Sequence, residues 1–203
     1  MHTKRVYSAA AVALLVATGL PAGAADDGTA LSAKVDQAIS AAASYHIAVA
    51  GPNGLALDIV SAGRDRVRVQ SMAGGTASES VVIGTAMYFK TAANPWAAAA
   101  VAPVRRARKN LLYMAAPDTK LEPLADRTDA GVTYGAFGSL AVGNSGVPAT
   151  MECTYEKATY RPHACTVVLQ SLPVPLHVTY DKWNDPSNAV EPPPGVSPPT
   201  PSP

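Results

Sequence analysis

Residues 44–60 read SYHIAVAGPNGLALDIV, and this stretch decides the fold. Large aliphatic side chains recur at every second position over residues 47–49 and again over residues 55–59. A period of two places them on one face of an extended strand. Asn53 and Gly54 stand between the two runs, and Asn-Gly is the strongest short signal for a tight hairpin turn. The stretch therefore predicts two antiparallel strands that share one apolar face.

Further alternating runs follow over residues 66–70, 78–83 and 87–90, and glycine-containing turns separate them. With the first hairpin they make a series of five short strands at about ten-residue spacing, which predicts an antiparallel meander. One face of this sheet is apolar, and the other carries Arg and Lys. Other elements must cover the apolar face, because it has to be buried against something.

Helices are expected on both sides of the meander. Residues 29–44 place Leu31, Val35 and Ile39 at helical spacing and predict an N-terminal helix. Residues 95–115 begin at an Asn-Pro pair that is typical of a helix start, and they are expected to form a helical lid.

The second half of the chain returns to a period of two. Five more strand candidates lie over residues 121–125, 132–139, 149–156, 164–171 and 176–180. The predicted fold class is α+β: a strongly curved antiparallel sheet, an incomplete β-barrel of about ten strands, with an N-terminal helix and a helical lid. A two-sheet sandwich is the alternative. Residues 25–185 are expected to form this single domain, and the proline-rich residues 186–203 a disordered tail.

Residues 1–24 have the features of a cleaved export signal. Lys4 and Arg5 precede an apolar run over residues 9–16, and small residues lead to Ala24. This pattern predicts a signal peptide cleaved after Ala24 and a mature protein in the periplasm. The alternative is an uncleaved membrane anchor, although the run is shorter than the ~20 apolar residues that a bilayer span needs.

The charge balance argues against nucleic acid as a partner. The chain has 16 Lys and Arg against 15 Asp and Glu, so losing Lys4 and Arg5 with the signal leaves 14 against 15 and a net charge of −1. Proteins that bind nucleic acid usually present a strongly basic face.

Cys153 and Cys165 are the two cysteines of the chain. In an oxidising compartment an isolated pair is most simply a disulfide. Their flanking residues alternate, so an antiparallel hairpin would bring the two sulfurs to a suitable separation. The alternative is a redox-active pair, but the C-x-x-C spacing of such sites is absent. A structural disulfide is therefore predicted.

Three segments of the chain carry a family resemblance. Residues 44–47 are similar to the entry into a first strand after an N-terminal helix. Residues 83–96 contain a Gly…Tyr-x-Lys…Trp run, and residues 178–193 contain a closing strand followed by a proline-rich exit. Over residues 29–195 the chain resembles the LolA-like fold of periplasmic lipoprotein carriers and bacterial lipid-binding lipoproteins.

This resemblance implies a protein that binds a lipid, a lipoprotein acyl chain or another apolar ligand in a half-barrel cavity, as a monomer, without catalysis and without a cofactor. Such a cavity needs no diagnostic polar motif, because burial alone contributes about 0.8 kcal/mol per CH₂ group. The same apolar face would equally suit a dry, filled core, and both interpretations stay open. The expected lining residues are Ile47, Val49, Leu55, Leu57, Ile59, Val67, Val69, Met87 and Phe89.

A basic run at Arg105, Arg106, Arg108 and Lys109 is the main charged feature. A solvated helix face explains it most simply, and the alternative is a contact with anionic lipid headgroups, a membrane surface or an envelope protein. The histidines lack ligand spacing, so no metal site is expected, and no catalytic constellation stands out. The alternative functions are an envelope interaction or structural module with a filled core and a Pro-rich docking tail, and a hydrolase with an unrecognised site.

Overall fold

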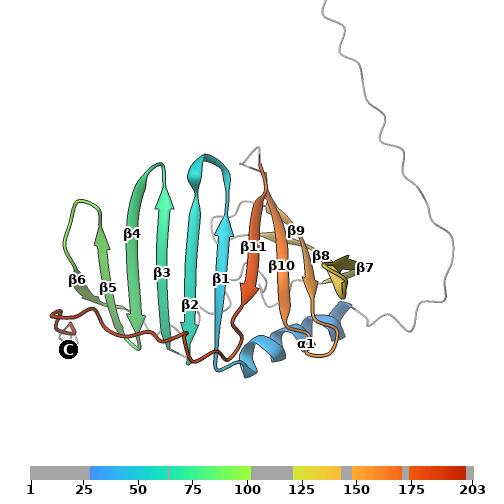
Figure 1. The fold of residues 1–203 in the computed structure, drawn as a ribbon, viewed down its shortest axis with the longest axis horizontal. Helices are drawn as coiled ribbons and strands as arrows, with labels where there is room; N and C mark the ends of the chain where they lie inside the picture. Colours follow the sequence, from blue (N-terminus) through green and yellow to red (C-terminus); the bar gives the residue numbers. More distant parts are fainter. Residues whose placement is uncertain (1–27, 64, 102–120, 143–147, 171–173, 200–203) are drawn as a thin grey trace, which may run out of the picture.

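Figure 1 shows the fold of the protein in a computed structural model. The structure describes residues 28–63, 65–101, 121–142, 148–170 and 174–199. These residues form one α-helix, a short 3₁₀ turn and eleven strands. Among the described residues, no helix combines the length and the apolar character that crossing a membrane requires.

All strands belong to one antiparallel sheet with the order β6-β5-β4-β3-β2-β1-β11-β10-β9-β8-β7. The first strand therefore pairs with the last, which joins the two halves of the chain in the middle of the sheet (Figure 1). The sheet stays open at β6 and β7. The strands are β1 (Ser44–Ala50), β2 (Ala56–Ala62), β3 (Arg66–Ala73), β4 (Thr76–Ile83), β5 (Ala86–Thr91), β6 (Ala97–Ala100), β7 (Glu122–Asp129), β8 (Val132–Val142), β9 (Pro148–Tyr155), β10 (Pro162–Leu169) and β11 (Leu176–Asp181).

The first hairpin forms where the Asn-Gly signal predicts it. Asn53 and Gly54 both have positive φ angles, 57° and 72°, which Asn and Gly tolerate better than other residues. The resulting register places Ile47 opposite Ile59. A single register slip would move every apolar side chain to the other face, so this turn helps to fix which face is buried.

Helix α1 (Gly28–Ala41) covers one face of the sheet, which we call the inner face. Its Leu31, Val35 and Ile39 are buried and share one core cluster with inner-face side chains of the strands. Phe137 of β8 is completely buried in that cluster. The helix ends three residues before the predicted end at residue 44, because the chain is already extended at Ser44.

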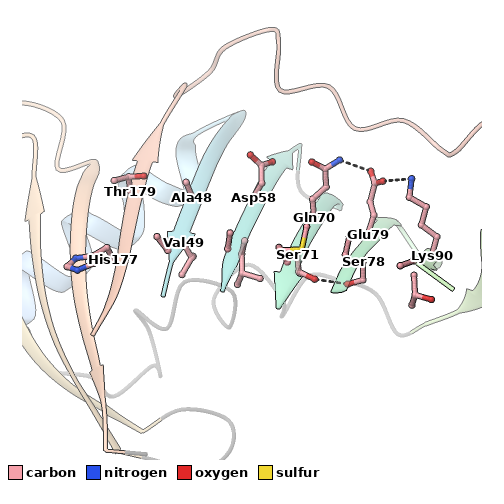
Figure 2. Close-up of a pocket in the computed structure, with 17 residues that line it drawn as sticks. Ala48, Val49, Asp58, Gln70, Ser71, Ser78, Glu79, Lys90, His177 and Thr179 are labelled. Carbon is pink, nitrogen blue, oxygen red and sulfur yellow. Dashed lines mark hydrogen bonds and ion pairs between the residues drawn. The ribbon is translucent and has the colours of Figure 1, made fainter. Parts of the chain in front are cut away.

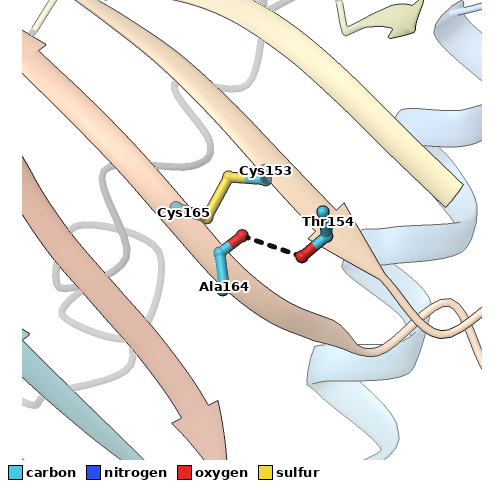
Figure 3. Close-up of a disulfide and its surroundings, with 4 residues drawn as sticks. All are labelled: Cys153, Thr154, Ala164 and Cys165. Carbon is cyan, nitrogen blue, oxygen red and sulfur yellow. Dashed lines mark hydrogen bonds between the residues drawn. A yellow bond between two sulfur atoms is a disulfide. The ribbon is translucent and has the colours of Figure 1, made fainter. Parts of the chain in front are cut away.

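The predicted disulfide is confirmed. Cys153 of β9 and Cys165 of β10 are register partners, with Cα atoms 4.1 Å apart (Figure 3). Next to it, the Thr154 hydroxyl donates a hydrogen bond to the Ala164 carbonyl oxygen at 3.3 Å. Both sulfurs lie in the inner-face core, so the bond links neighbouring strands within the packed region.

Residues 184–199, which we call the strap, run along the opposite, outer face of the sheet (Figure 1). Val190 is only 2% exposed and packs in a cluster with Val60, Val81 and Tyr88. Arg66 donates a hydrogen bond to the Val190 carbonyl oxygen at 3.3 Å. A disordered tail is therefore wrong for residues 186–199. Prolines prevent strand pairing there, but an extended segment can still bury apolar side chains against a sheet.

Polar contacts beside β1 hold the beginning of the strap, which we call its root. The Ala43 backbone N–H donates to the Asn184 side-chain oxygen at 2.7 Å. Asn188 is buried, and its side-chain amide donates to the Ser44 hydroxyl at 3.1 Å. These bonds fix the direction in which the chain leaves β11.

The start of the expected helical lid is a strand and not a helix. Residues 97–100 form the edge strand β6, which pairs with β5 in the register Phe89↔Ala97 and Ala86↔Ala100. Alanine favours helix intrinsically, but tertiary pairing overrides that weak preference here. The remainder of the predicted lid, residues 102–115, lies outside the described residues.

Candidate functional site

The nine predicted lining residues belong to the side of the sheet that α1 covers. Ile47, Ile59 and Val67 are 2–3% exposed and lie in the packed core. The partly buried members packed against this core are Val49, Leu55, Leu57 and Val69. Met87 and Phe89 of β5 are not members of the cluster, and Phe89 is 40% exposed. The middle of this face is therefore closely packed, whereas β5 presents apolar side chains beyond it.

A cavity of about 740 Å³ lies on the outer face, and we call it the trough. Its lining comes from six neighbouring strands, from β11 through β1 to β5 (Figure 2). Strands lie about 4.8 Å apart, so the trough extends roughly 24 Å across the sheet. Small-molecule pockets usually have volumes of about 300–1,000 Å³, and the trough falls within this range.

Small side chains line one side of the trough. Ala50 lies opposite Ala56, Ala56 opposite Met72, and Met72 opposite Ala77. This row of mostly methyl side chains leaves space above the backbone that larger residues would fill. Two of the predicted lining residues, Val49 and Leu57, also border the trough. Their side chains belong to the inner face, where they pack against the core. The trough is thus on the face opposite to the predicted one.

A polar row forms the other wall of the trough. Asp58, Gln70, Glu79 and Lys90 are successive cross-strand partners on β2 to β5. Gln70 donates to Glu79 at 3.2 Å, and the Lys90 ammonium lies 3.0 Å from the same carboxylate (Figure 2). Lys90 also sits 4.9 Å from the centre of the Trp96 ring, a cation–π distance. The wall is therefore held in place by its own contacts.

His46 connects the trough to the root of the strap. Its Nε2 lies 2.8 Å from the Asp58 carboxylate, and its Nδ1 lies 2.5 Å from the Asp181 carboxylate. Each ring nitrogen of His46 therefore faces one carboxylate at hydrogen-bond distance. The imidazole is largely buried, with 11% of the side chain exposed, while the two carboxylates are about half exposed.

The contacts of His46 indicate a structural role rather than catalysis. Both ring nitrogens are already engaged by carboxylates. The nearest hydroxyl along the same face of β1, Ser44, donates to the Asp185 carbonyl oxygen instead. The arrangement therefore lacks the nucleophile-to-base hydrogen bond of a Ser-His-Asp triad. In the described part of the chain, His, Cys, Asp and Glu side chains do not form a group of three that could hold a metal ion.

The sequence also predicts two other features, a basic run and a disulfide. The basic run at residues 105–109 lies outside the described residues. The Cys153–Cys165 disulfide lies on the inner face, two to three strands from β1.

The trough itself was missed because its lining looks unremarkable in the sequence. One pattern in the sequence could have indicated it. Small side chains recur on a face that is expected to carry large polar residues, at Ala48, Ala50, Ala56 and Ala77.

This chain is similar to solved structures at low sequence identity. No family model matches the sequence, and no curated protein matches it. The lipoprotein LppX of Mycobacterium tuberculosis is similar in structure at 15% identity and a TM-score of 0.48, covering 78% of this chain and 97% of that one. A LolA superfamily protein from Nitrosomonas europaea is similar at 12% identity and a TM-score of 0.34, covering 77% and 92%. At these values the likeness by itself assigns no ligand or activity to this chain.

Proposed function

We propose that this protein is an exported, periplasmic, non-enzymatic binding protein that holds a lipid acyl chain or another apolar ligand against its sheet. The observation that supports this most directly is the trough, an open cavity of about 740 Å³ with alanine side chains along one wall. Its extent across six strands suits an elongated ligand better than a compact one.

The energetics of such binding are simple. Each CH₂ group removed from water contributes about 0.8 kcal/mol, so a long chain gains affinity without any directed polar contact. The cost is the ordering of a flexible chain, which an extended trough limits by offering one direction. Reversible capture and release follow from this balance, because no covalent step is involved.

The inner face is the alternative location for the ligand. The observation that favours it is the exposure of Phe89. This side chain is 40% exposed although it belongs to the predicted lining. A ligand on the inner face would contact the β5 side chains Met87 and Phe89, whereas a ligand in the trough would contact Ala50 and Ala56. The two locations can therefore be separated by substitution.

The test is a fluorescence titration with the neutral apolar dye Nile red. Ala50→Leu combined with Ala56→Leu fills the trough at two exposed, cross-strand paired positions. We expect it to weaken dye binding by at least about tenfold, because the lost depth removes most of the contact surface. Ala100→Leu is the matched control, since Ala100 is an exposed alanine on the edge strand β6 and does not line the trough.

Phe89→Ser completes the comparison. If it abolishes dye binding while the double alanine variant binds like the unmodified protein, the ligand lies on the inner face and the trough assignment is wrong. If the unmodified protein binds neither the dye nor a fatty acid, the proposed function itself is wrong.

A further inference from the structure

Arg68 is a cation on the outer face, next to the trough. It lies on β3 between Val60 of β2 and Val81 of β4. Two residues further along the same face is Gln70 of the polar wall, about 7 Å away along the strand. The Arg68 Nε atom is buried and has no hydrogen-bond partner among the described residues.

The other Lys and Arg side chains of this half of the outer face are paired. Arg66 lies 3.9 Å from the Glu191 carboxylate, and Lys90 lies 3.0 Å from Glu79. Arg68, in contrast, makes no ion pair with a carboxylate in the described part of the chain. The buried Nε–H of Arg68 without an acceptor is unfavourable, because a desolvated donor without an acceptor costs free energy.

Two carboxylates on the strands beside Arg68 are already engaged by other groups. Asp58 accepts a bond from His46, and Glu79 accepts bonds from Gln70 and Lys90. Asp58 and Glu79 are diagonal neighbours of Arg68 in the sheet. Each lies two residues from the residue that pairs directly with Arg68, on β2 and β4 respectively. The Nε–H of Arg68 therefore lacks an acceptor within the described part of the chain.

We infer that the ligand of the trough is an anionic amphiphile, whose carboxylate or phosphate head is bound by Arg68 while its chain lies in the trough. This inference rests on the proposed function, and it adds the chemical class of the headgroup. A planar guanidinium with its fork of donors matches carboxylate and phosphate oxygens and binds them more strongly than a neutral acceptor. The position of Arg68 at the side of the trough would direct the head toward the strap and leave the alanine-lined wall to the chain.

The experiment compares two ligands that differ only in the head. Dodecanoic acid, ionised at pH 8, and the neutral dodecanol each compete with bound Nile red on the unmodified full chain. We expect the acid to compete with a dissociation constant at least about tenfold lower than the alcohol, the effect of one hydrogen bond to a charged group. In Arg68→Gln we expect the ratio of the two constants to fall close to one.

Arg66→Gln is the matched control, because Arg66 is on the same strand and face but binds the strap. It should keep the ratio of the unmodified protein, which excludes a general charge effect. A ratio that survives Arg68→Gln, or a ratio near one in the unmodified protein, overturns the inference. Displacement of the dye by inorganic phosphate alone, lost in Arg68→Gln, also overturns it in favour of a free anion. If neither dodecanoic acid nor dodecanol displaces bound dye, the proposed function fails rather than the headgroup assignment alone.

Discussion

His46 Nε2 lies 2.8 Å from the Asp58 carboxylate, so a buried imidazole of the central strand β1 is bonded to a wall residue of the trough. The opposite nitrogen contacts Asp181, the last residue of β11 before the chain turns toward the strap. This single side chain therefore ties the trough, the pairing of β1 with β11 and the beginning of the strap together.

Replacing His46 with Gln should destabilise the fold. The glutamine amide cannot reach both carboxylates from one position, so at least one of the two contacts of His46 is lost. We expect the free energy of unfolding to fall by about 1–3 kcal/mol, measured by urea denaturation near neutral pH. His177→Gln, an exposed position on the same face, should change it by less than about 0.5 kcal/mol. Equal effects of the two substitutions would contradict the bridging role.

Removing the disulfide should lower stability without changing the fold. The bond closes a loop between residues 12 apart in sequence, and such cross-links contribute about 2–4 kcal/mol, mainly by restricting the unfolded chain. We expect the Cys153→Ala, Cys165→Ala variant to unfold at lower denaturant concentration than the oxidised protein. Adding a reductant should shift the unmodified protein toward the variant and leave the variant unchanged. A midpoint insensitive to reductant would show that the bond contributes nothing.

Alkaline pH should destabilise the protein through Tyr180. Burial raises the pKa of its phenol well above the ordinary value, and the nearby Tyr45 adds to this. In the unfolded chain the phenol ionises near pH 10, so only the folded state must keep it protonated above that pH. The contribution is therefore fully present below about pH 10 and is lost as the pH rises further. Tyr180→Phe should flatten the fall in unfolding free energy between pH 9 and pH 11, and an unchanged slope would contradict this origin.

The strap should detach when its buried anchor becomes charged. Val190→Asp places a carboxylate in the outer-face cluster with Val60, Val81 and Tyr88, where an unpaired charge is costly. We expect proteases to cut residues 184–199 much faster than in the unmodified protein, while the sheet stays intact. Ala189→Asp adds the same charge at the exposed neighbouring position and serves as control. Equal cleavage rates in both variants would mean that Val190 does not hold the strap.

Local patterns predict the strands of this protein well, and two examples show why. The Asn53-Gly54 turn and the alternation around it carry enough information to fix the first hairpin and its register. The alternation around Cys153 and Cys165 likewise predicts their juxtaposition, because a hairpin leaves little freedom in pairing. Both depend on residues close together in the sequence.

Features that depend on distant contacts were not predictable in this way. The strap is ordered because Val190 meets Val60 and Val81, more than 100 positions earlier in the chain. Strand β6 forms from alanines only because β5 is available as a partner. The trough needs the register of six strands at once, so no single segment of sequence contains its signal.

The most direct test of the binding function is native mass spectrometry of the full chain, isolated without denaturation from the cells that produce it. We predict a bound mass that is released on unfolding, extracts into organic solvent as an apolar or amphiphilic compound, and is strongly reduced in the Ala50→Leu, Ala56→Leu variant but retained in Ala100→Leu. A spectrum that shows only the unliganded chain, unchanged after addition of dodecanoic acid, would contradict the account.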